Sequence, residues 1–269
     1  MNSPSILIAG FGDAMNYGGE AIVHGTLRMV FDAFPKAMVT VATVNLESAG
    51  RAFSGYPNVR IIQSQQRFSP YRVMMGLLRR VGIGNGSPVR MKLRIADGHD
   101  IVLSVGGDNF VQKGISTLLD DLIRLGERAI ANGSFYCLWG ASVGPFEDKD
   151  CFERVSRHLK KAHLIVAREV EARDYLADLG CSENVVMAAD PAFMMKPKQH
   201  DSAGTGRHNS DVLIGVNFSR LALDYMQPKM PEQESIQRLA ECVRGLLALS
   251  DNTHVLMIPH VMSSVGGSQ

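Results

Sequence analysis

The sequence lacks the motifs that most often mark metal and dinucleotide chemistry. It has no His-x-x-x-His pair, no Cys/His cluster at ligand spacing and no Cys-x-x-Cys pair, so we expect no metal ion and no bound cofactor. An apolar run near the N-terminus leads into glycines, but without G-x-G-x-x-G spacing or a following G-K-[ST]. This spacing argues against a dinucleotide site and against a Walker loop.

Long apolar runs and a strong charge of either sign are also missing. No apolar run approaches the ~18 residues of a membrane helix, and no charged signal-peptide region begins the chain. The net charge of +1 argues against nucleic acid as a partner. Three of the four scattered cysteines lie in apolar or helical contexts, which favours reduced thiols. We expect a cytoplasmic protein.

What the sequence does contain is a regular alternation of buried strands and helices. Runs rich in Val, Ile and Leu predict strands, and stretches with helical periodicity separate them, which is typical of a doubly wound α/β domain. The predicted strands are Ser5–Ala9, Met38–Val44, Val59–Gln63, Ile101–Val105, Phe135–Trp139, Leu164–Ala167 and Val185–Ala188. The clearest predicted helices are 20–34, 117–132, 151–162 and 169–179.

A polar stretch divides the chain into two predicted domains. Residues 1–195 form the first, residues 196–210 have the Gly, Pro and polar composition of a linker, and residues 211–269 form the second. The second domain holds a strand within 211–219, a helix at 231–249 and a strand at Val255–Ile258. One β-α-β unit is too small for an independent sheet, so the second domain is expected to be truncated.

The loop after the first strand is the first candidate ligand site. It carries Gly12, Asn16, Gly18 and Gly19, and the helix is expected to begin at Glu20. Backbone N–H groups at such a helix start can face an anion. The unusual glycine spacing favours a smaller or sugar-bearing ligand over a dinucleotide.

Further candidates follow the ends of other predicted strands, where open α/β sheets bind their ligands. After Ile101–Val105 come Gly106 and Gly107, then Asp108 and Asn109, which either orient a sugar hydroxyl or cap a helix. Arg168 either grips a phosphate or carboxylate or forms a salt bridge with Glu169, Glu171 or another carboxylate. Asp190 is either a catalytic carboxylate or a helix cap. In the second domain the candidates are Asn217, Ser219 and His260.

A basic stretch lies between Arg67 and Arg94. It contains seven basic residues and no acidic one, with apolar residues interleaved in its first half. One interpretation is a solvated helix and loop at the rim of the domain. The other is a patch that meets an anionic substrate or a membrane surface.

Taken together, these blocks resemble the polysaccharide pyruvyl transferase family. The resemblance rests on residues 12–22, the glycine pair 106–107 and Ala141–Pro145. It continues through Arg168, Asp190–Ala192, Gly215–Asn217 and Ile258–His260. It implies two Rossmann-like domains facing across a cleft, similar to GT-B glycosyltransferases. It also implies transfer of the pyruvyl group of phosphoenolpyruvate to a sugar hydroxyl, forming a ketal in exopolysaccharide or cell-surface glycan biosynthesis.

The resemblance assigns the ligands and the titratable groups. Phosphoenolpyruvate is the implied donor, and a sugar or lipid-linked oligosaccharide is the implied acceptor. The acceptor suggests peripheral contact with the inner face of the membrane, and homo-oligomerisation is compatible with the sequence. Asp108, Asp190 and His260 are the candidate catalytic residues. Gly12, Asn16, Gly18, Gly19, Glu20, Gly106, Gly107, Asn109, Arg168, Asn217 and Ser219 are the candidate substrate-binding residues.

Two alternatives stay open. Family members carry a further Arg-x-His motif beyond the Pro-His strand, and the residues after His260 do not contain it. An inactive truncated relative acting as a binding or scaffold protein is therefore one alternative. A GT-B-type glycosyltransferase that uses a nucleotide-sugar is the other.

Overall fold

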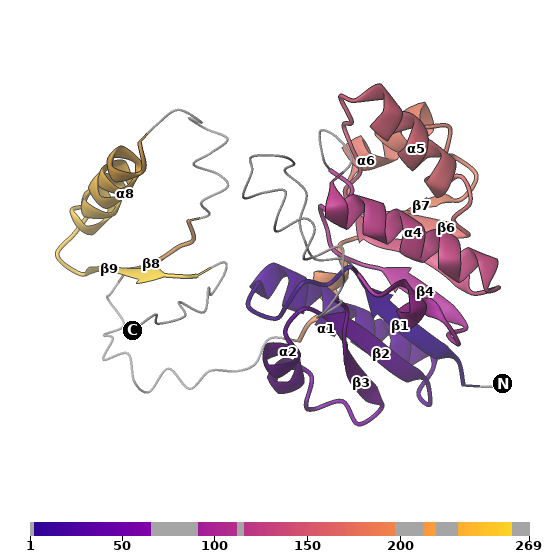
Figure 1. The fold of residues 1–269 in the computed structure, drawn as a ribbon. Helices are drawn as coiled ribbons and strands as arrows, with labels where there is room; N and C mark the ends of the chain where they lie inside the picture. Colours follow the sequence, from indigo (N-terminus) through magenta and orange to yellow (C-terminus); the bar gives the residue numbers. More distant parts are fainter. Residues whose placement is uncertain (1–2, 66–90, 112–115, 197–211, 219–230, 260–269) are drawn as a thin grey trace, which may run out of the picture. The chain divides into compact units, whose positions relative to one another are not determined.

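The computed structural model of the 269-residue chain describes residues 3–65, 91–111, 116–196, 212–218 and 231–259. The chain divides into two compact units, Met1–Met195 and Lys196–Gln269. The first unit holds an extended parallel sheet flanked by helices, and the second holds two strands and one helix (Figure 1).

The first unit is built on a seven-stranded sheet in which all described pairings are parallel. The strand order is β3-β2-β1-β4-β5-β6-β7. The chain therefore winds outward from β1 in one direction and, after β3, returns to continue from β4 in the other. The strands are β1 (Ser5–Ala9), β2 (Met38–Thr43), β3 (Val59–Gln63), β4 (Ile101–Ser104), β5 (Phe135–Ala141), β6 (Leu164–Ala167) and β7 (Val185–Met187). The α/β class with a Rossmann-like parallel sheet is confirmed.

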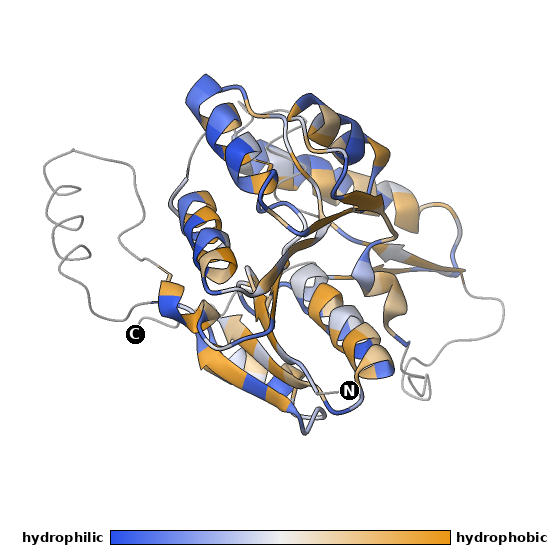
Figure 2. Cartoon of the chain, turned by 90° about the vertical axis from the view of Figure 1, so that its right-hand side faces the viewer, coloured by the Kyte–Doolittle hydropathy of each residue, from blue (hydrophilic) through white to orange (hydrophobic). Residues whose placement is uncertain are grey.

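Helices cover both faces of this sheet. Ile6 and Ile8 point into one hydrophobic cluster with α1 and α2, whereas Leu7 and Ala9 point into the other with α4, α5 and α6. Both sets are buried, which explains why the strand is apolar throughout instead of alternating. The helices are α1 (Tyr17–Ala33), α2 (Leu46–Ala52), α4 (Thr117–Ala131), α5 (Lys149–Leu159) and α6 (Val170–Asp178). Figure 2 shows largely hydrophobic strands, and helices that carry hydrophilic as well as hydrophobic residues.

Capping residues set the helix starts, and they account for the main errors of the sequence prediction. α1 begins at Tyr17 and not at Glu20, because the Asn16 side chain accepts hydrogen bonds from the first-turn N–H groups. α5 likewise begins at Lys149, where Asp148 caps it. The short helix α2 was not predicted, because its seven residues carry no apolar stripe; Asn45 caps it. Two short 3-10 helices, η1 (Leu93–Ala96) and η2 (Pro191–Met194), complete the first unit.

The second unit contains β8 (Val212–Val216), α8 (Glu232–Leu247) and β9 (Thr253–Met257). The two strands are parallel neighbours. β9 begins two residues earlier than predicted, and Thr253 at its start is buried. Within the described ranges, no helix is long and apolar enough to cross a membrane.

Candidate functional site

The candidate site lies at the carboxyl edge of the first sheet. The strand order reverses between β1 and β4, whose connections lead to opposite faces of the sheet. Two loops therefore diverge at this point, which is where open α/β sheets bind ligands. Gly10 follows β1 with φ 90° and Gly106 follows β4 with φ 112°, in the left-handed region that favours glycine.

Asn109 joins these two loops. Its Nδ2 group donates to the carbonyl of Gly10 at 3.0 Å and to the carbonyl of Val105 at 2.9 Å. A Cβ at Gly10 would overlap the Val105 carbonyl oxygen, and one at Gly106 would overlap the Asn109 amide. Both amide protons are thus directed at main-chain carbonyls. These hydrogen bonds give Asn109 a bracing role between β1 and β4.

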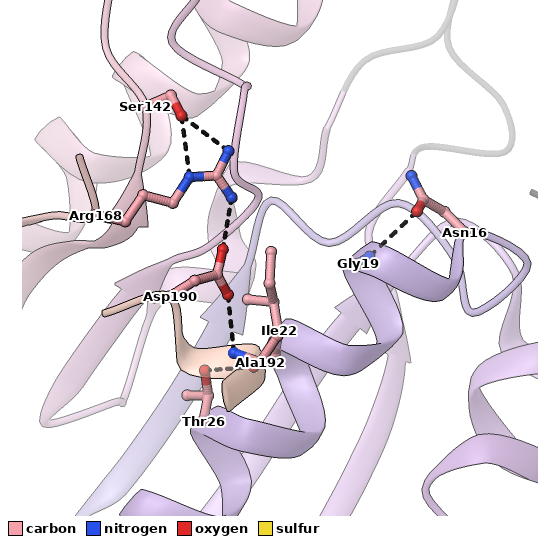
Figure 3. Close-up of polar contacts among 8 residues, drawn as sticks. All are labelled: Asn16, Gly19, Ile22, Thr26, Ser142, Arg168, Asp190 and Ala192. Atoms are coloured by element: carbon pink, nitrogen blue, oxygen red, sulfur yellow. Dashed lines mark hydrogen bonds and ion pairs between the residues drawn. The ribbon is translucent and has the colours of Figure 1, made fainter. Parts of the chain in front are cut away.

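Hydrogen bonds fix the conformation of the loop that follows β1. The Gly12 carbonyl accepts hydrogen bonds from the Val44 N–H and the Thr43 hydroxyl, each at 2.8 Å. The Asn16 side-chain oxygen accepts from the N–H group of Gly18 at 3.1 Å. It also accepts from the N–H group of Gly19 at 3.2 Å (Figure 3). Gly18 and Gly19 therefore lie inside the first turn of α1. Asn16 accepts from two of the backbone N–H groups that were expected to face an anion.

Glu20 lies in the first turn of α1 beside another titratable side chain. Its carboxylate is 3.5 Å from Nε2 of His24, and Nδ1 of His24 is 3.0 Å from the Tyr56 hydroxyl. Burial raises the pKa of Tyr56, and the nearby charge of Arg28 opposes that shift. Glu20 thus interacts with α1 itself and, through His24, with Tyr56 in the loop between α2 and β3.

A second group of polar side chains surrounds Arg168, which directly follows β6. The guanidinium donates from Nε and Nη2 to the hydroxyl of Ser142, at 3.0 and 2.8 Å. Its Nη1 donates to Oδ2 of Asp190 at 2.7 Å (Figure 3). The other carboxylate oxygen of Asp190 accepts from the Ala192 N–H at 2.8 Å. Of the alternatives for Arg168, the structure contains a salt bridge, and its partner is Asp190.

Close backbone packing holds this group in place. A Cβ at Gly107 would lie 2.7 Å from Cζ of Arg168, so the guanidinium rests directly on the Gly107 peptide. The Ser142 N–H donates to the Gly107 carbonyl at 2.6 Å, which ties the loops after β4 and β5 together. On the other side, Pro191 packs against the glycines at 25 and 140, where a side chain would overlap it.

Residues 140–144 read Gly-Ala-Ser-Val-Gly, which is a G-x-S-x-G pattern. In serine hydrolases such a segment forms a strained elbow between a strand and a helix. Ser142 does not have that geometry, since positive φ in the described residues is confined to glycine. Its hydroxyl faces an arginine instead of a histidine. The segment supports Arg168, and Ser142 is the site residue that sequence reasoning missed.

The remaining candidates are spread over both units. Asp108 is exposed and directly follows Gly107, the residue that packs against the guanidinium of Arg168. In the second unit, Asn217 donates from Nδ2 to the Ile258 carbonyl at 2.9 Å and joins the ends of β8 and β9. Ser219 and His260 lie outside the described residues, as do five of the seven residues of the basic stretch. Among the described residues, no group of three or more His, Cys, Asp or Glu could hold a metal ion.

A Rossmann-like sheet with a polar group at its carboxyl edge defines a broad class of ligand-binding α/β proteins. The comparisons narrow this class. The family model for polysaccharide pyruvyl transferase matches residues 16–261, nearly the whole chain. The protein belongs to the polysaccharide pyruvyl transferase family. A search of curated proteins finds no match.

Solved structures agree at the level of the fold. A putative UDP-N-acetylglucosamine 2-epimerase from Listeria monocytogenes is similar with a TM-score of 0.56 and 13% identity. The similarity covers 96% of this chain and 62% of that one. A second UDP-N-acetylglucosamine 2-epimerase gives a TM-score of 0.53 and 13% identity, over 94% of this chain and 63% of that one. The chain thus spans less than two thirds of the length of these neighbours.

Proposed function

We propose that the protein transfers the pyruvyl group of phosphoenolpyruvate to sugar hydroxyls in exopolysaccharide or cell-surface glycan biosynthesis. Membership of a transferase family supports the reaction class. The observation that carries the donor assignment is Arg168, a half-buried guanidinium at the carboxyl edge of the sheet. A guanidinium there suits a small, highly charged donor, because its planar N–H groups match a carboxylate or a phosphate.

The reaction makes clear what the site must supply. Protonation at the methylene carbon of phosphoenolpyruvate makes C2 electrophilic, and one sugar hydroxyl adds to it. A second hydroxyl of the sugar then displaces phosphate from C2 and closes the ketal. One hydroxyl proton compensates for the proton that was added to form the methyl group, and the other leaves with inorganic phosphate. A proton donor at C3 and a base for the hydroxyls are therefore needed.

The proposal assigns these proton transfers to Asp108 and His260. Asp108 is accessible beside Gly107, whereas both carboxylate oxygens of Asp190 already accept hydrogen bonds within the first unit. His260 directly follows the Pro259 that ends the last described segment of the second unit. Gly12, Asn16, Gly18, Gly19, Glu20, Gly106, Gly107, Asn109, Asn217 and Ser219 remain the proposed substrate-binding residues, with Asn16 and Asn109 acting by shaping loops.

The proposal includes a cytoplasmic reaction, at the inner face of the membrane when the acceptor is lipid-linked. The basic stretch 67–94 is the proposed contact with anionic lipid. No cofactor takes part, since the donor carries its own leaving group. Homo-oligomerisation is compatible with this assignment and is not required by it.

Phosphate release tests the proposal. The full chain is incubated with phosphoenolpyruvate and glycan acceptors, and both inorganic phosphate and the pyruvyl ketal on the acceptor are measured. A family member of known activity is assayed in parallel to show that the acceptors are competent. Acceptor-dependent release that is lost in Asp108→Asn supports the assignment. Release by the positive control but not by this chain would overturn it.

Calorimetry separates the proposal from the glycosyltransferase alternative. Phosphoenolpyruvate, UDP-sugars and GDP-sugars are titrated into the same preparation. We expect heat from phosphoenolpyruvate and none from the nucleotide-sugars, because the guanidinium of Arg168 suits a small, highly charged donor. Tight binding of a nucleotide-sugar without binding of phosphoenolpyruvate would favour the alternative.

A further inference from the structure

The guanidinium of Arg168 makes more hydrogen bonds to the protein than its salt bridge with Asp190. Three of its nitrogens donate to protein acceptors, two to the Ser142 hydroxyl and one to Asp190. It also packs closely against Gly107, where a Cβ would overlap it. An arginine side chain normally keeps much rotamer freedom, and restraining it in advance removes that entropic cost from ligand binding.

The hydrogen bonds leave a defined part of the guanidinium for a ligand. Nη1 and Nη2 each carry two N–H groups, and one on each is used. The second N–H on each nitrogen makes no hydrogen bond to the part of the chain that the structure describes. The Arg168 side chain keeps 24% of its surface exposed, so part of the side chain is open to a ligand.

We propose that Ser142, together with Asp190, is a positioning residue that locks Arg168 so that its two remaining terminal N–H groups form a fixed fork for an oxyanion. The inference rests on the proposed function, in which that oxyanion is a phosphate or carboxylate oxygen pair of phosphoenolpyruvate. Two parallel N–H donors match such a pair. Ser142 thereby has a function in ligand binding. Asp190 supports Arg168 and does not act as an acid or base.

The surroundings of Ser142 explain why a serine suits this task. Ser142 is 8% exposed, and its N–H is bonded to the Gly107 carbonyl at 2.6 Å. The next loop residues are also fixed, because the Gly144 N–H donates to the Phe110 carbonyl at 2.8 Å and a side chain at 144 would overlap the ring of Tyr175. A hydroxyl on such a rigid segment accepts both guanidinium protons without adding charge. Among the described residues, Asp190 makes the ion pair with this guanidinium, and the serine adds no second negative charge that would repel an anion.

Affinity for phosphoenolpyruvate tests the fork in the full chain. Arg168→Ala should abolish binding in calorimetry, and Ser142→Ala should weaken it about tenfold, since a loosened arginine must be reordered by each ligand. Ser156→Ala is the matched control, since Ser156 is equally buried and its hydroxyl donates only to the Leu179 carbonyl. It should leave the affinity unchanged.

The outcomes separate this inference from the proposed function. Wild-type affinity in Ser142→Ala, with binding lost in Arg168→Ala, overturns the positioning role and leaves the donor assignment standing. Unchanged affinity in Arg168→Ala overturns the fork itself. Covalent labelling of Ser142 by a fluorophosphonate probe would also overturn the inference, because it would make the hydroxyl a nucleophile.

If the wild-type chain binds no phosphoenolpyruvate, the donor assignment is refuted. The positioning of Arg168 by Ser142 can then still be tested by a measurement on the protein without ligand. The Nε–Hε signal of Arg168 in nitrogen-15-labelled protein should be rigid and slow to exchange with water. It should become mobile in Ser142→Ala and stay rigid in Ser156→Ala. Equal rigidity in both variants would show that Ser142 does not position the arginine.

The pH dependence of phosphate release distinguishes support from acid–base catalysis at Asp190. If Asp190 positions Arg168, Asp190→Asn should raise KM for phosphoenolpyruvate and leave both limbs of the kcat profile in place. Loss of one limb would make Asp190 an acid or base and overturn this part of the inference. Asp148→Asn is the control, because Asp148 also caps a helix but has no bonded arginine. It should leave KM unchanged.

Discussion

Replacing Gly25 by alanine should destabilise the first unit, although alanine is the better helix former. Gly25 lies inside α1, where a Cβ would overlap the Pro191 carbonyl oxygen and lie 3.2 Å from the Ala192 nitrogen. The obstacle is backbone, which cannot turn aside as a flexible side chain would. Overpacking of this kind costs about 1–3 kcal/mol. The gain in helix propensity offsets about 1 kcal/mol of it. We expect the free energy of unfolding to fall by up to about 2 kcal/mol.

The matched control is Gly50→Ala in α2. Gly50 is exposed and a Cβ there would meet nothing within 4 Å. Only the propensity effect remains, so this variant should gain about 0.5–1 kcal/mol. The two substitutions are chemically identical and should have opposite signs.

Urea unfolding followed by tryptophan fluorescence measures both variants. Trp139 is the only tryptophan, and its indole N–H donates to the hydroxyl of Thr26 at 3.1 Å, one residue from Gly25. The signal therefore reports on the contact between α1 and its neighbours. A midpoint for Gly25→Ala at or above that of the wild type would refute the close packing of α1 on η2.

Three further predictions address other parts of the molecule. Burial, aided by the charges of Lys161 and Arg154, lowers the pKa of His158 from 6.5 to about 4. Because the unfolded chain binds this proton more readily, stability should fall by up to about 3 kcal/mol as the pH drops from 6.5 to 4. His158→Gln should lose that part of the pH dependence in urea titrations, and an unchanged dependence would contradict it. Asn109→Asp places a carboxylate oxygen next to two main-chain carbonyl oxygens, so it should lower the unfolding free energy by about 2–4 kcal/mol. A stability equal to that of the wild type would contradict the bracing role of Asn109. A thiol reagent should modify Cys242 alone in the native protein, since the other three cysteines are buried and burial raises the pKa of Cys137 to about 12. Modification of all four thiols at similar rates would contradict the packing of the core.

The strands were predictable because each is a nearly continuous apolar run. β1 and β6 have the predicted bounds, since burial on both faces requires apolar residues at successive positions. The edge strand β3 also has the predicted bounds, although none of its residues is fully buried. Helix starts were less predictable. Gly18 and Gly19 suggested a loop, and only the bonded Asn16 places them in the first turn of α1. Propensity disfavours glycine in a helix, and a local cap outweighed it here.

The candidate site was predictable as a set of strand ends but not as a network. Arg168 and Asp190 each follow a strand, so both could be named in advance. Their pairing could not be predicted, because Glu169 and Glu171 were nearer in sequence and equally suitable in charge. Ser142 drew no attention, since a serine between glycines reads as a turn until its hydroxyl is seen to face the guanidinium.

The sequence by itself determined the α/β alternation and the family to which the chain belongs. Both depend on residue types in order along the chain, namely apolar runs, glycine-rich loops and the blocks that the family model matches across residues 16–261. Only the tertiary structure decided that the Asp190 carboxylate and the Ser142 hydroxyl are both directed at one arginine. The physical reason is that hydrogen bonding is directional and short-ranged. The partners of a polar group depend on how the strand ends meet at the edge of the sheet, and sequence order does not specify that.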